Sequence, residues 1–181
     1  MYMKYFTEYV SHEAEIKGKR KKIDNTIYTF DIETTSYLVL NNKIISGVEY
    51  DNLTEDEKEE AIKCACMYEW TFGINDDIYF GRTWDEFIYF LTLLRENDNH
   101  KKIVFVHNLA FEFQFIKSIL NFERVFAREK HKVMFAYNEE FNIEFRCTYL
   151  MSNASLSQLP KLFKLPVQKL VRGFRLFTYK N

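Results

Sequence analysis

The sequence predicts a single α/β domain built around one sheet, and three observations carry this prediction. The chain has 181 residues, of which 47% are hydrophobic, so it can bury one substantial core. Short β-branched and aromatic runs alternate along the chain with stretches of helical periodicity. Two of the apolar runs are followed directly by polar groups, as expected where catalytic residues lie at strand ends of an α/β sheet.

Composition excludes several other classes of protein. The net charge of -1, with 28% charged residues, does not by itself identify a nucleic-acid-binding protein. The three cysteines, Cys64, Cys66 and Cys147, form no C-x-x-C pair, so we expect reduced thiols and neither a disulfide framework nor a zinc site. No window approaches the roughly 20 apolar residues of a membrane span. We therefore expect a soluble, cytoplasmic protein without a membrane partner.

We expect three segments along the chain: a lead-in over residues 1–25, the folded domain over 26–170, and a tail over 171–181. The lead-in ends in a basic run over residues 17–22. A solvated loop is one interpretation of this run, and a DNA contact is the other.

In the first half of the domain, the TIYTF run predicts a buried strand over residues 26–30 that ends at Asp31. A second strand is expected over residues 43–50. Thr54, followed by three acids, is typical of a helix N-cap, and a further strand is expected over 62–72.

The second half begins with a helix that starts at Thr83 and presents one apolar face, formed by Phe87, Phe90, Leu91 and Leu94. The wholly apolar run IVFV predicts a strand over residues 103–106, covered on both faces. The remaining expected elements are a helix through residues 115–120, strands over 125–137 and 141–149, and a helix that starts within 155–159.

The first candidate for chemistry is the pair Asp31 and Glu33. Two acids separated by one residue at a strand end point to the same side and can share a divalent cation, as a metal-dependent nuclease requires. A solvated pair of acids is the alternative.

The second candidate follows the IVFV strand, where His107, Asn108 and Glu112 place another carboxylate beside a predicted helix start. The intervening aromatics suggest two roles. Core packing accounts for two of Phe111, Phe113 and Phe115, whereas one exposed ring could stack on a DNA base.

Taken in order, the segments YTFDIETT, VHNLAFEFQF and SLSQL resemble the exonuclease domain of protein-primed family B DNA polymerases of viral and phage type. The resemblance covers most of residues 27–170. It implies a ribonuclease H-like (DEDD exonuclease) fold, a mixed sheet flanked by helices. It also implies that Asp31 and Glu33 are metal-binding carboxylates, with Thr34 beside them.

The other two motifs imply further roles. Asn108, Phe111 and Glu112 match the second exonuclease motif, with His107 in the same stretch. Ser155 and Leu156, with Leu159, match a Ser/Thr-Leu motif that helps to hold a single-stranded primer end.

The sequence departs from the family in two ways. Glu112 stands where the family usually has Asp. The third motif, Tyr-x-x-x-Asp, is missing, since no Asp follows Asp98. We therefore expect a C-terminally incomplete exonuclease domain without polymerase activity. From Phe145 onward the sequence has Lys and Arg but no acid, which suits either a phosphate-backbone contact or a basic surface exposed by truncation.

The resemblance implies a 3′→5′ proofreading exonuclease that acts on single-stranded DNA 3′ ends with two Mg²⁺ or Mn²⁺ ions held by Asp31, Glu33 and Glu112. Three alternatives remain open. The chain binds single-stranded DNA without cutting it; one of Glu139, Glu140 and Glu144 supplies the missing carboxylate; or the chain associates with the remainder of a polymerase or with a terminal protein.

Overall fold

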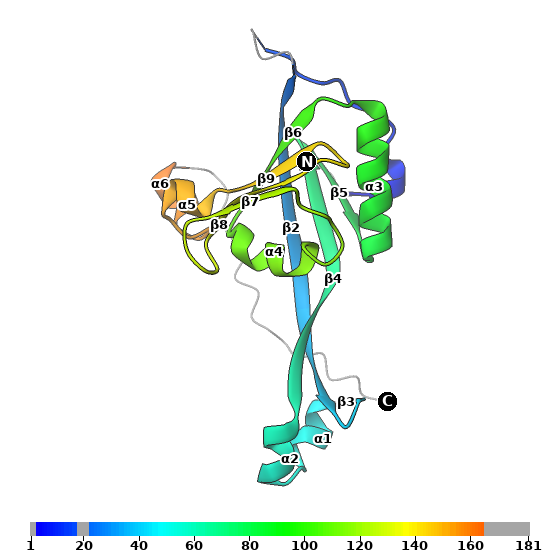
Figure 1. The fold of residues 1–181 in the computed structure, drawn as a ribbon, viewed down its shortest axis with the longest axis vertical. Coiled ribbons are helices and arrows are strands. Elements are labelled where there is room, and N and C mark those ends of the chain that lie inside the picture. Colours follow the sequence, from blue (N-terminus) through cyan, green and yellow to red (C-terminus); the bar gives the residue numbers. More distant parts are fainter. Residues whose placement is uncertain (1–2, 18–21, 165–181) are drawn as a thin grey trace.

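The computed structural model describes residues 3–17 and 22–164, and in this part of the chain the strands form one nine-stranded mixed sheet (Figure 1). The strands are β1 (Met3–Tyr5), β2 (Ile23–Leu40), β3 (Lys43–Ile45), β4 (Ile62–Ile74), β5 (Asp77–Gly81), β6 (Lys101–Val106), β7 (Arg124–Ala127), β8 (Val133–Asn138) and β9 (Ile143–Cys147). The helices are η1 (Phe6–Glu8), α1 (Gly47–Asp51), α2 (Glu55–Glu60), α3 (Trp84–Asn97), α4 (Leu109–Ile116), α5 (Tyr149–Ser152) and α6 (Leu159–Leu162). The α/β prediction is confirmed.

The sheet order is β1-β5-β4-β2-β6-β9-β8-β7, and β3 pairs with the far end of β2. Strands β2, β6 and β9 run parallel side by side. Strand β1 is parallel to β5, whereas the pairs β5–β4, β4–β2, β9–β8 and β8–β7 are antiparallel. The carboxyl ends of β6 and β9 therefore open toward the same edge, beside the middle of β2. Chain segments that follow these two strands meet there.

The two faces of β2 have different environments because successive side chains of a strand point to opposite sides. Tyr28, Phe30 and Ile32 are buried, whereas Asp31 and Glu33 are exposed on the other face. Helix α3 covers the buried face. Its predicted apolar stripe, formed by Phe87, Phe90, Leu91 and Leu94, is fully buried, which confirms the helix read from the sequence.

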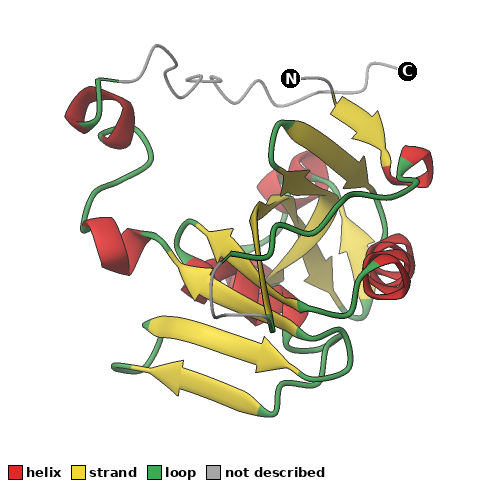
Figure 2. Cartoon of the chain, turned by 90° about the horizontal axis from the view of Figure 1, so that it is seen from above, coloured by secondary structure: helices red, strands yellow, loops and turns green. Residues whose placement is uncertain are grey.

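Aromatic rings fill the space between α3 and the sheet. Phe87 of α3 stacks on Phe30 with ring centroids 4.9 Å apart, and Trp70 of β4 lies 5.2 Å from Phe87. Trp70 also donates its indole N–H to the Thr83 carbonyl at 2.9 Å, which holds the start of α3 against β4. Seen from above, α3 is viewed along its axis at the side of the sheet (Figure 2).

Helix α4 packs on strands β8 and β9 and shares the core with α3. The rings of Phe113 and Phe122 lie 5.4 Å apart, Phe122 lies 6.1 Å from Phe145, and Phe145 lies 5.8 Å from Phe30. This chain of rings places α4 on the same side of the sheet as α3. The opposite side of β6, β9 and β8 carries no helix from this pair, and we call it the open face.

The predicted end of the first strand at residue 30 is wrong. Strand β2 runs without interruption to Leu40, so Asp31 and Glu33 lie in its middle. The segment Thr34, Thr35 and Ser36 looks like a strand exit, but threonines favour extended backbone, and here they pair with Ala65, Cys66 and Met67 of β4. The register shifts between Glu33 and Thr34, immediately beyond the acidic pair.

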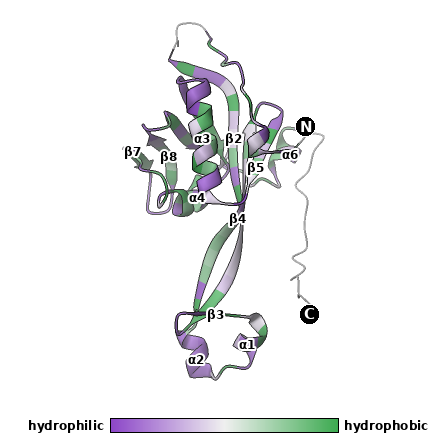
Figure 3. Ribbon diagram, turned by 90° about the vertical axis from the view of Figure 1, so that its right-hand side faces the viewer, coloured by the Kyte–Doolittle hydropathy of each residue, from purple (hydrophilic) through white to green (hydrophobic). Residues whose placement is uncertain are grey.

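Beyond this shift, residues 34–67 form an arm that projects from the body as a two-stranded ribbon and ends in β3, α1 and α2 (Figures 1 and 3). The predicted N-cap Thr54 is confirmed, since its hydroxyl accepts from the Glu57 amide at 3.3 Å. Helices α1 and α2 bury none of their residues. The arm therefore adds little to the core.

Three other boundaries differ from the predictions. Only residues 43–45 of the predicted second strand are extended, because Ser46 caps helix α1. Helix α4 begins at Leu109 and ends at Ile116, earlier than predicted. The segment predicted as one strand over 125–137 is a hairpin of β7 and β8. The last helix starts at Leu159, at the end of its predicted range.

Part of the lead-in packs against the body of the domain. Strand β1 pairs in parallel with β5, and Phe6 and Tyr9 are buried in the core. Lys17 pairs with Glu15 at 2.6 Å. Residues 18–21 of the basic run and the whole predicted tail over 171–181 lie outside the described residues. In the part that is described, no helix is long and apolar enough to cross a membrane.

Candidate active site

A cavity of about 560 Å³ lies where the carboxyl ends of β6 and β9 meet the middle of β2. Three segments that are far apart in the sequence contribute to it: β2, the β6–α4 junction and the segment after β9. Its lining residues are Thr29, Phe30, Asp31, Ile32, Glu33, Phe105, His107, Asn108, Phe111, Glu112, Thr148, Leu156 and Leu159. All three predicted metal-binding carboxylates line this cavity.

The buried member of the acidic set is Glu112, which lies in the first turn of α4. It belongs to the buried side of the helix, together with Leu109 and Ile116. Glu112 is only 4% exposed, and its Oε2 atom has no hydrogen-bond partner. Burial raises the pKa of the Glu112 carboxyl to about 8, and the charge of Asp31 and a hydrogen bond to it act in the same direction. At neutral pH Glu112 therefore holds a proton against Asp31.

Glu33 lies on the same face of β2 as Asp31, two residues further along. Its cross-strand partner in β4 is Glu69, which is itself paired with Arg82 at 3.4 Å. Arg82 therefore offsets the negative charge of one of the two glutamates that face each other at this point. The register shift that follows Glu33 separates the acidic pair from the arm.

His107 extends the cavity wall at the end of β6. Its Nδ1 atom lies 3.2 Å from the Thr148 hydroxyl, and its ring meets the edge of Tyr149 at 5.7 Å between centroids. The Thr148 amide donates to the Val106 carbonyl at 2.8 Å, so the residue that follows β9 is fixed beside the end of β6. Thr148 thus orients the imidazole.

Asn108 connects β6 to α4 through a left-handed backbone conformation, with φ 63° and ψ 50°. Asn adopts this region more readily than other residues with a β-carbon. The turn lets α4 begin at once, which brings Glu112 back toward β2. Asn108 thus shapes the site through its backbone while its side chain lines the cavity.

Two exposed apolar side chains flank the cavity mouth. Phe111 is 43% exposed and Leu156 is 42% exposed, although both line the cavity. Phe113 and Phe115, by contrast, pack against the core. The sequence interpretation, with two rings in the core and one exposed, is confirmed, and Phe111 is the exposed ring.

Two predicted site residues do not line the cavity. Thr34 lies beyond the register shift, at the base of the arm. Ser155 makes local contacts instead: its amide donates to the Gln158 side chain at 2.9 Å, and its hydroxyl lies 2.9 Å from the Ser157 hydroxyl. Conversely, Thr29, Phe105 and Thr148 line the cavity and were missed, because only the strand register places them there.

The carboxylates fit a divalent cation in chemistry, since Mg²⁺ and Mn²⁺ prefer oxygen ligands and Glu112 offers an unpartnered buried oxygen beside Asp31. They do not form a closed set. Across residues 3–17 and 22–164, no group of three or more His, Cys, Asp or Glu side chains is close enough to hold a metal ion. Metal binding by the three carboxylates stays a prediction.

None of the three glutamates considered as a replacement ligand is among the residues that line the cavity. Glu139 and Glu140 are exposed in the turn between β8 and β9. Glu144 is buried, and the hydrogen bonds from Lys101 and Arg146 outweigh the opposing effect of burial and hold its pKa below the usual range. These ion pairs occupy Glu144 away from the cavity.

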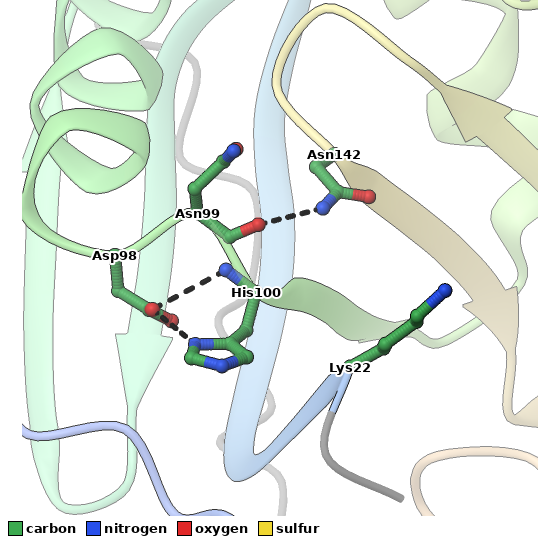
Figure 4. A pocket seen from close by; sticks show the side chains of 5 residues that line it. All are labelled: Lys22, Asp98, Asn99, His100 and Asn142. Carbon is green, nitrogen blue, oxygen red and sulfur yellow. Dashed lines mark hydrogen bonds and ion pairs between the residues drawn. The ribbon is translucent and has the colours of Figure 1, made fainter.

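A second cavity of about 410 Å³ lies at the opposite, amino ends of β6 and β9 (Figure 4). Its lining residues are Lys22, Asp98, Asn99, His100 and Asn142. The Asn142 amide donates to the Asn99 carbonyl at 2.8 Å, and the His100 ring is paired with Asp98. These polar groups join the loops before β6 and β9, and none of the predicted site residues is among them.

No protein-family model and no curated protein matches the chain. Its structure is similar to that of Phi29 DNA polymerase complexed with primer-template DNA and incoming nucleotide substrates, with a TM-score of 0.55 and 12% identity. This similarity covers 82% of the present chain and 25% of the polymerase chain. Phi29 DNA polymerase complexed with primer-template DNA alone gives a TM-score of 0.49 and 13% identity, over 80% and 24% of the two chains.

The first of these similarities shows a shared fold. The predicted fold class, a mixed α/β sheet flanked by helices and consistent with a ribonuclease H-like fold, is therefore confirmed. The chain spans about a quarter of the length of the polymerase whose fold it shares.

Proposed function

We propose that this chain is a metal-dependent 3′→5′ exonuclease module of a DNA-replicating polymerase and acts on single-stranded DNA 3′ ends. The observation that carries the proposal is the contact between Asp31 and the buried Glu112 inside the cavity. Two carboxyls that share a proton in a partly enclosed site are poised to exchange that proton for a divalent cation. The motif resemblance and the shared fold support the same conclusion.

Asp31, Glu33 and Glu112 would hold Mg²⁺ or Mn²⁺, which supplies Lewis-acid chemistry at a phosphodiester when bound. The remaining residues act on the strand. Asn108 and His107 line the wall beside the carboxylates, where they would contact the terminal phosphate and sugar.

The mouth of the cavity fits a base better than a duplex. Phe111 offers an exposed ring for stacking, and Leu156 adds a second exposed apolar side chain to the cavity lining. Thr34 and Ser155, which lie outside the cavity lining, would contact the strand only further from its end.

The resemblance to viral, protein-primed polymerases suggests partners for this module, namely the remainder of a polymerase or a terminal protein. It also suggests the cytoplasm of a host cell as the place of action. The free thiols of Cys64, Cys66 and Cys147 are compatible with that reducing compartment.

A second candidate function is the binding of single-stranded DNA without cleavage. The open arrangement of the three carboxyls favours it, because they do not form a closed metal-binding set in the described part of the chain. Retention of a proton on Glu112 acts in the same direction, since a neutral carboxyl binds a cation poorly.

The experiment is degradation of a 5′-labelled single-stranded oligonucleotide in Mg²⁺ and in Mn²⁺, with the Asp31→Ala, Glu33→Ala chain as the control. Stepwise shortening from the 3′ end by the parent alone supports the exonuclease. Folded parent protein that binds the oligonucleotide but leaves it intact in both metals supports the binding function instead.

A further inference from the structure

The open face carries a row of side chains that runs from the cavity to the outer edge of the sheet. Strand register aligns Phe126 of β7 with Phe135 of β8, Phe135 with Arg146 of β9, Arg146 with Phe105 of β6, and Phe105 with Thr29 of β2. Residues directly paired across strands point to the same face. Phe105 and Thr29, at the inner end of the row, line the cavity itself.

The members of this row are accessible, whereas their chain neighbours are not. Phe126 is 51% exposed, and Phe135, Arg146 and Phe105 are half-buried. The residues adjacent in sequence, among them Val104, Val106, Phe145 and Ala136, are fully buried under α3 and α4. The row is therefore a surface of the folded protein and not a part of its core.

The outer end of the row presents stacked rings. Phe126 and Phe135 lie 5.7 Å apart with their planes inclined by 23°. Strand β7 is the edge strand, and all four of its residues are exposed. An exposed stacked pair on a hairpin exposes apolar area that water solvates poorly but that a nucleic-acid base can cover.

Cations accompany these rings. The Arg146 side chain is 43% exposed, and Arg124 lies over the ring of Tyr137 at 4.7 Å in the neighbouring cross-strand pair. Glu144, on the same face, is paired with both Lys101 and Arg146. Two cations thus face one carboxylate, and the face keeps a net positive charge between its aromatic groups.

We propose that the row Phe126, Phe135, Arg146 and Phe105 binds single-stranded nucleic acid and guides it across the open face into the cavity. Three strand spacings of about 4.8 Å separate Phe126 from Phe105, so the row spans roughly 14 Å. Bases stack on Phe126 and Phe135 while the backbone passes Arg146. This inference rests on the proposed function in one respect, because it takes from that function that the 3′ end of the strand lies in the cavity.

The test measures oligonucleotide binding by fluorescence anisotropy, with EDTA and with the Asp31→Ala, Glu33→Ala chain so that nothing is cut. Two single-stranded ligands are compared, a trinucleotide that reaches only the cavity and a decanucleotide that also reaches the row. The row variant is Phe126→Ala, Phe135→Ala. Its matched control is Tyr89→Ala, which removes an exposed ring from α3, the helix on the other face.

The row variant should bind the decanucleotide at least about 30-fold more weakly, because it removes two rings and stacking on each contributes at least about 1 kcal/mol per base. The affinity of the row variant for the trinucleotide should stay within about twofold of the reference chain, because this ligand does not reach the two rings. The affinity of Tyr89→Ala for the decanucleotide should stay within the same range, because Tyr89 lies on the other face. Phe126→Leu, which preserves hairpin packing but removes the ring, should also weaken decanucleotide binding. Phe126→Trp should retain it.

Unchanged decanucleotide affinity in folded Phe126→Ala, Phe135→Ala and Phe126→Leu chains overturns this inference, even if the trinucleotide still binds and the proposed function stands. If the row variants instead lose only self-association in sedimentation, the face contacts protein and the inference is equally overturned. Failure of every version to bind either ligand contradicts the proposed function together with it.

Discussion

Glu112 is the buried carboxyl of the candidate site. It lies in the first turn of a helix, is nearly excluded from water, and has one oxygen without a hydrogen-bond partner. Asp31, the carboxyl with which it interacts, lies on an exposed face of β2. A structural glutamate would be expected to have its hydrogen bonds satisfied. The incomplete satisfaction of Glu112 is what a ligand-binding role requires.

Glu112→Gln should stabilise the metal-free protein at pH 8 and change it little at pH 5. The pKa of Glu112 is raised from about 4.5 to about 8 by burial and by Asp31, so the folded state keeps a proton that the unfolded state loses. The free energy of unfolding of the parent therefore falls as pH rises from about 4.5 to 8, by on the order of 2–4 kcal/mol. The neutral glutamine has no such dependence.

Chemical denaturation of both proteins at pH 5, 6, 7 and 8 measures this difference. Added Mn²⁺ should then restore the stability of the parent at pH 8 but leave Glu112→Gln unaffected, because the amide is a poorer ligand for a hard cation. Parallel pH profiles for the two proteins would mean that Glu112 is ionised in the fold and that its environment differs from the one described.

Most site residues were predictable at this scale. Asp31, Glu33, His107, Asn108, Phe111, Glu112 and Leu156 all reach one cavity, and each was singled out from its motif. Thr148 was not, because nothing in its sequence context distinguishes it. It belongs to the site only because β9 lies parallel to β6 and delivers its hydroxyl to His107.

Among the elements, strand β2 belongs to two different parts of the structure along its length. Up to Glu33 it is the central strand of the body, and beyond the register shift it is one side of the arm. The core contains Tyr28, Phe30 and Ile32 but no member from residues 36–65. A two-stranded ribbon is marginal alone, so the body must support the arm rather than the reverse.

Replacing residues 36–65 with Asn-Gly should therefore leave the body folded. Thr35 and Cys66 are paired across the ribbon, and a two-residue turn of this type joins such antiparallel partners. The melting temperature, followed by circular dichroism, should change by less than about 5 °C, since no residue of the core cluster that contains Tyr28 and Phe30 is removed. Loss of cooperative melting in the shortened chain would show that the arm contributes to the core.

The arm also marks where sequence reasoning failed. Long, periodic elements were found correctly, as α3 shows, because its apolar spacing and its Thr83 cap are local signals. The continuation of β2 depends on pairing with β4, which lies about thirty residues away and leaves no local signal in Thr34, Thr35 and Ser36.

At the scale of the whole molecule, the amino-terminal segment over residues 9–17 crosses from β1 to β2 and contacts the end of α3. We call this segment the strap. His12 is the centre of this strap: its ring bonds the hydroxyls of Tyr9 and Tyr28, and its carbonyl accepts from Asn97 at 2.9 Å. Asp24 accepts from the Glu15 amide at 2.9 Å and lies 3.6 Å from His12. The strap thereby joins β1, β2 and the end of α3.

His12→Ala should loosen the strap without unfolding the sheet. Loss of two side-chain hydrogen bonds should lower the free energy of unfolding by about 1–2 kcal/mol. Hydrogen exchange of the β1 amides should accelerate more than that of β6. Equal acceleration in both strands would show that the strap unfolds only with the whole protein.

Acid should act in the same direction. Burial lowers the pKa of His12, and the charge of Lys102 acts with it against the opposing effects of Asp24 and Asp98. The folded state therefore favours the neutral ring, and the stability that His12 contributes is lost as pH falls below about 6.5, where the unfolded histidine takes up a proton.

The sheet order itself was beyond the sequence. Alternating elements predict an α/β sheet, but the order of its strands and the row across its open face arise from the register between segments that lie far apart in the sequence, such as Ile23 and Lys101. The motifs predicted most of the residues that line the cavity, and the fold supplied the neighbours that surround them.

The central claim is that Asp31 and Glu112 exchange their shared proton for a divalent cation. Anomalous diffraction from crystals of the protein grown with Mn²⁺ at pH 8 tests this most directly, with Glu112→Gln crystals as the control. The account predicts a manganese peak between Asp31 and Glu112 in the parent that is absent or much weaker in the variant. Parent crystals with no manganese in this cavity, and with Asp31 and Glu112 still hydrogen-bonded to each other, would contradict it.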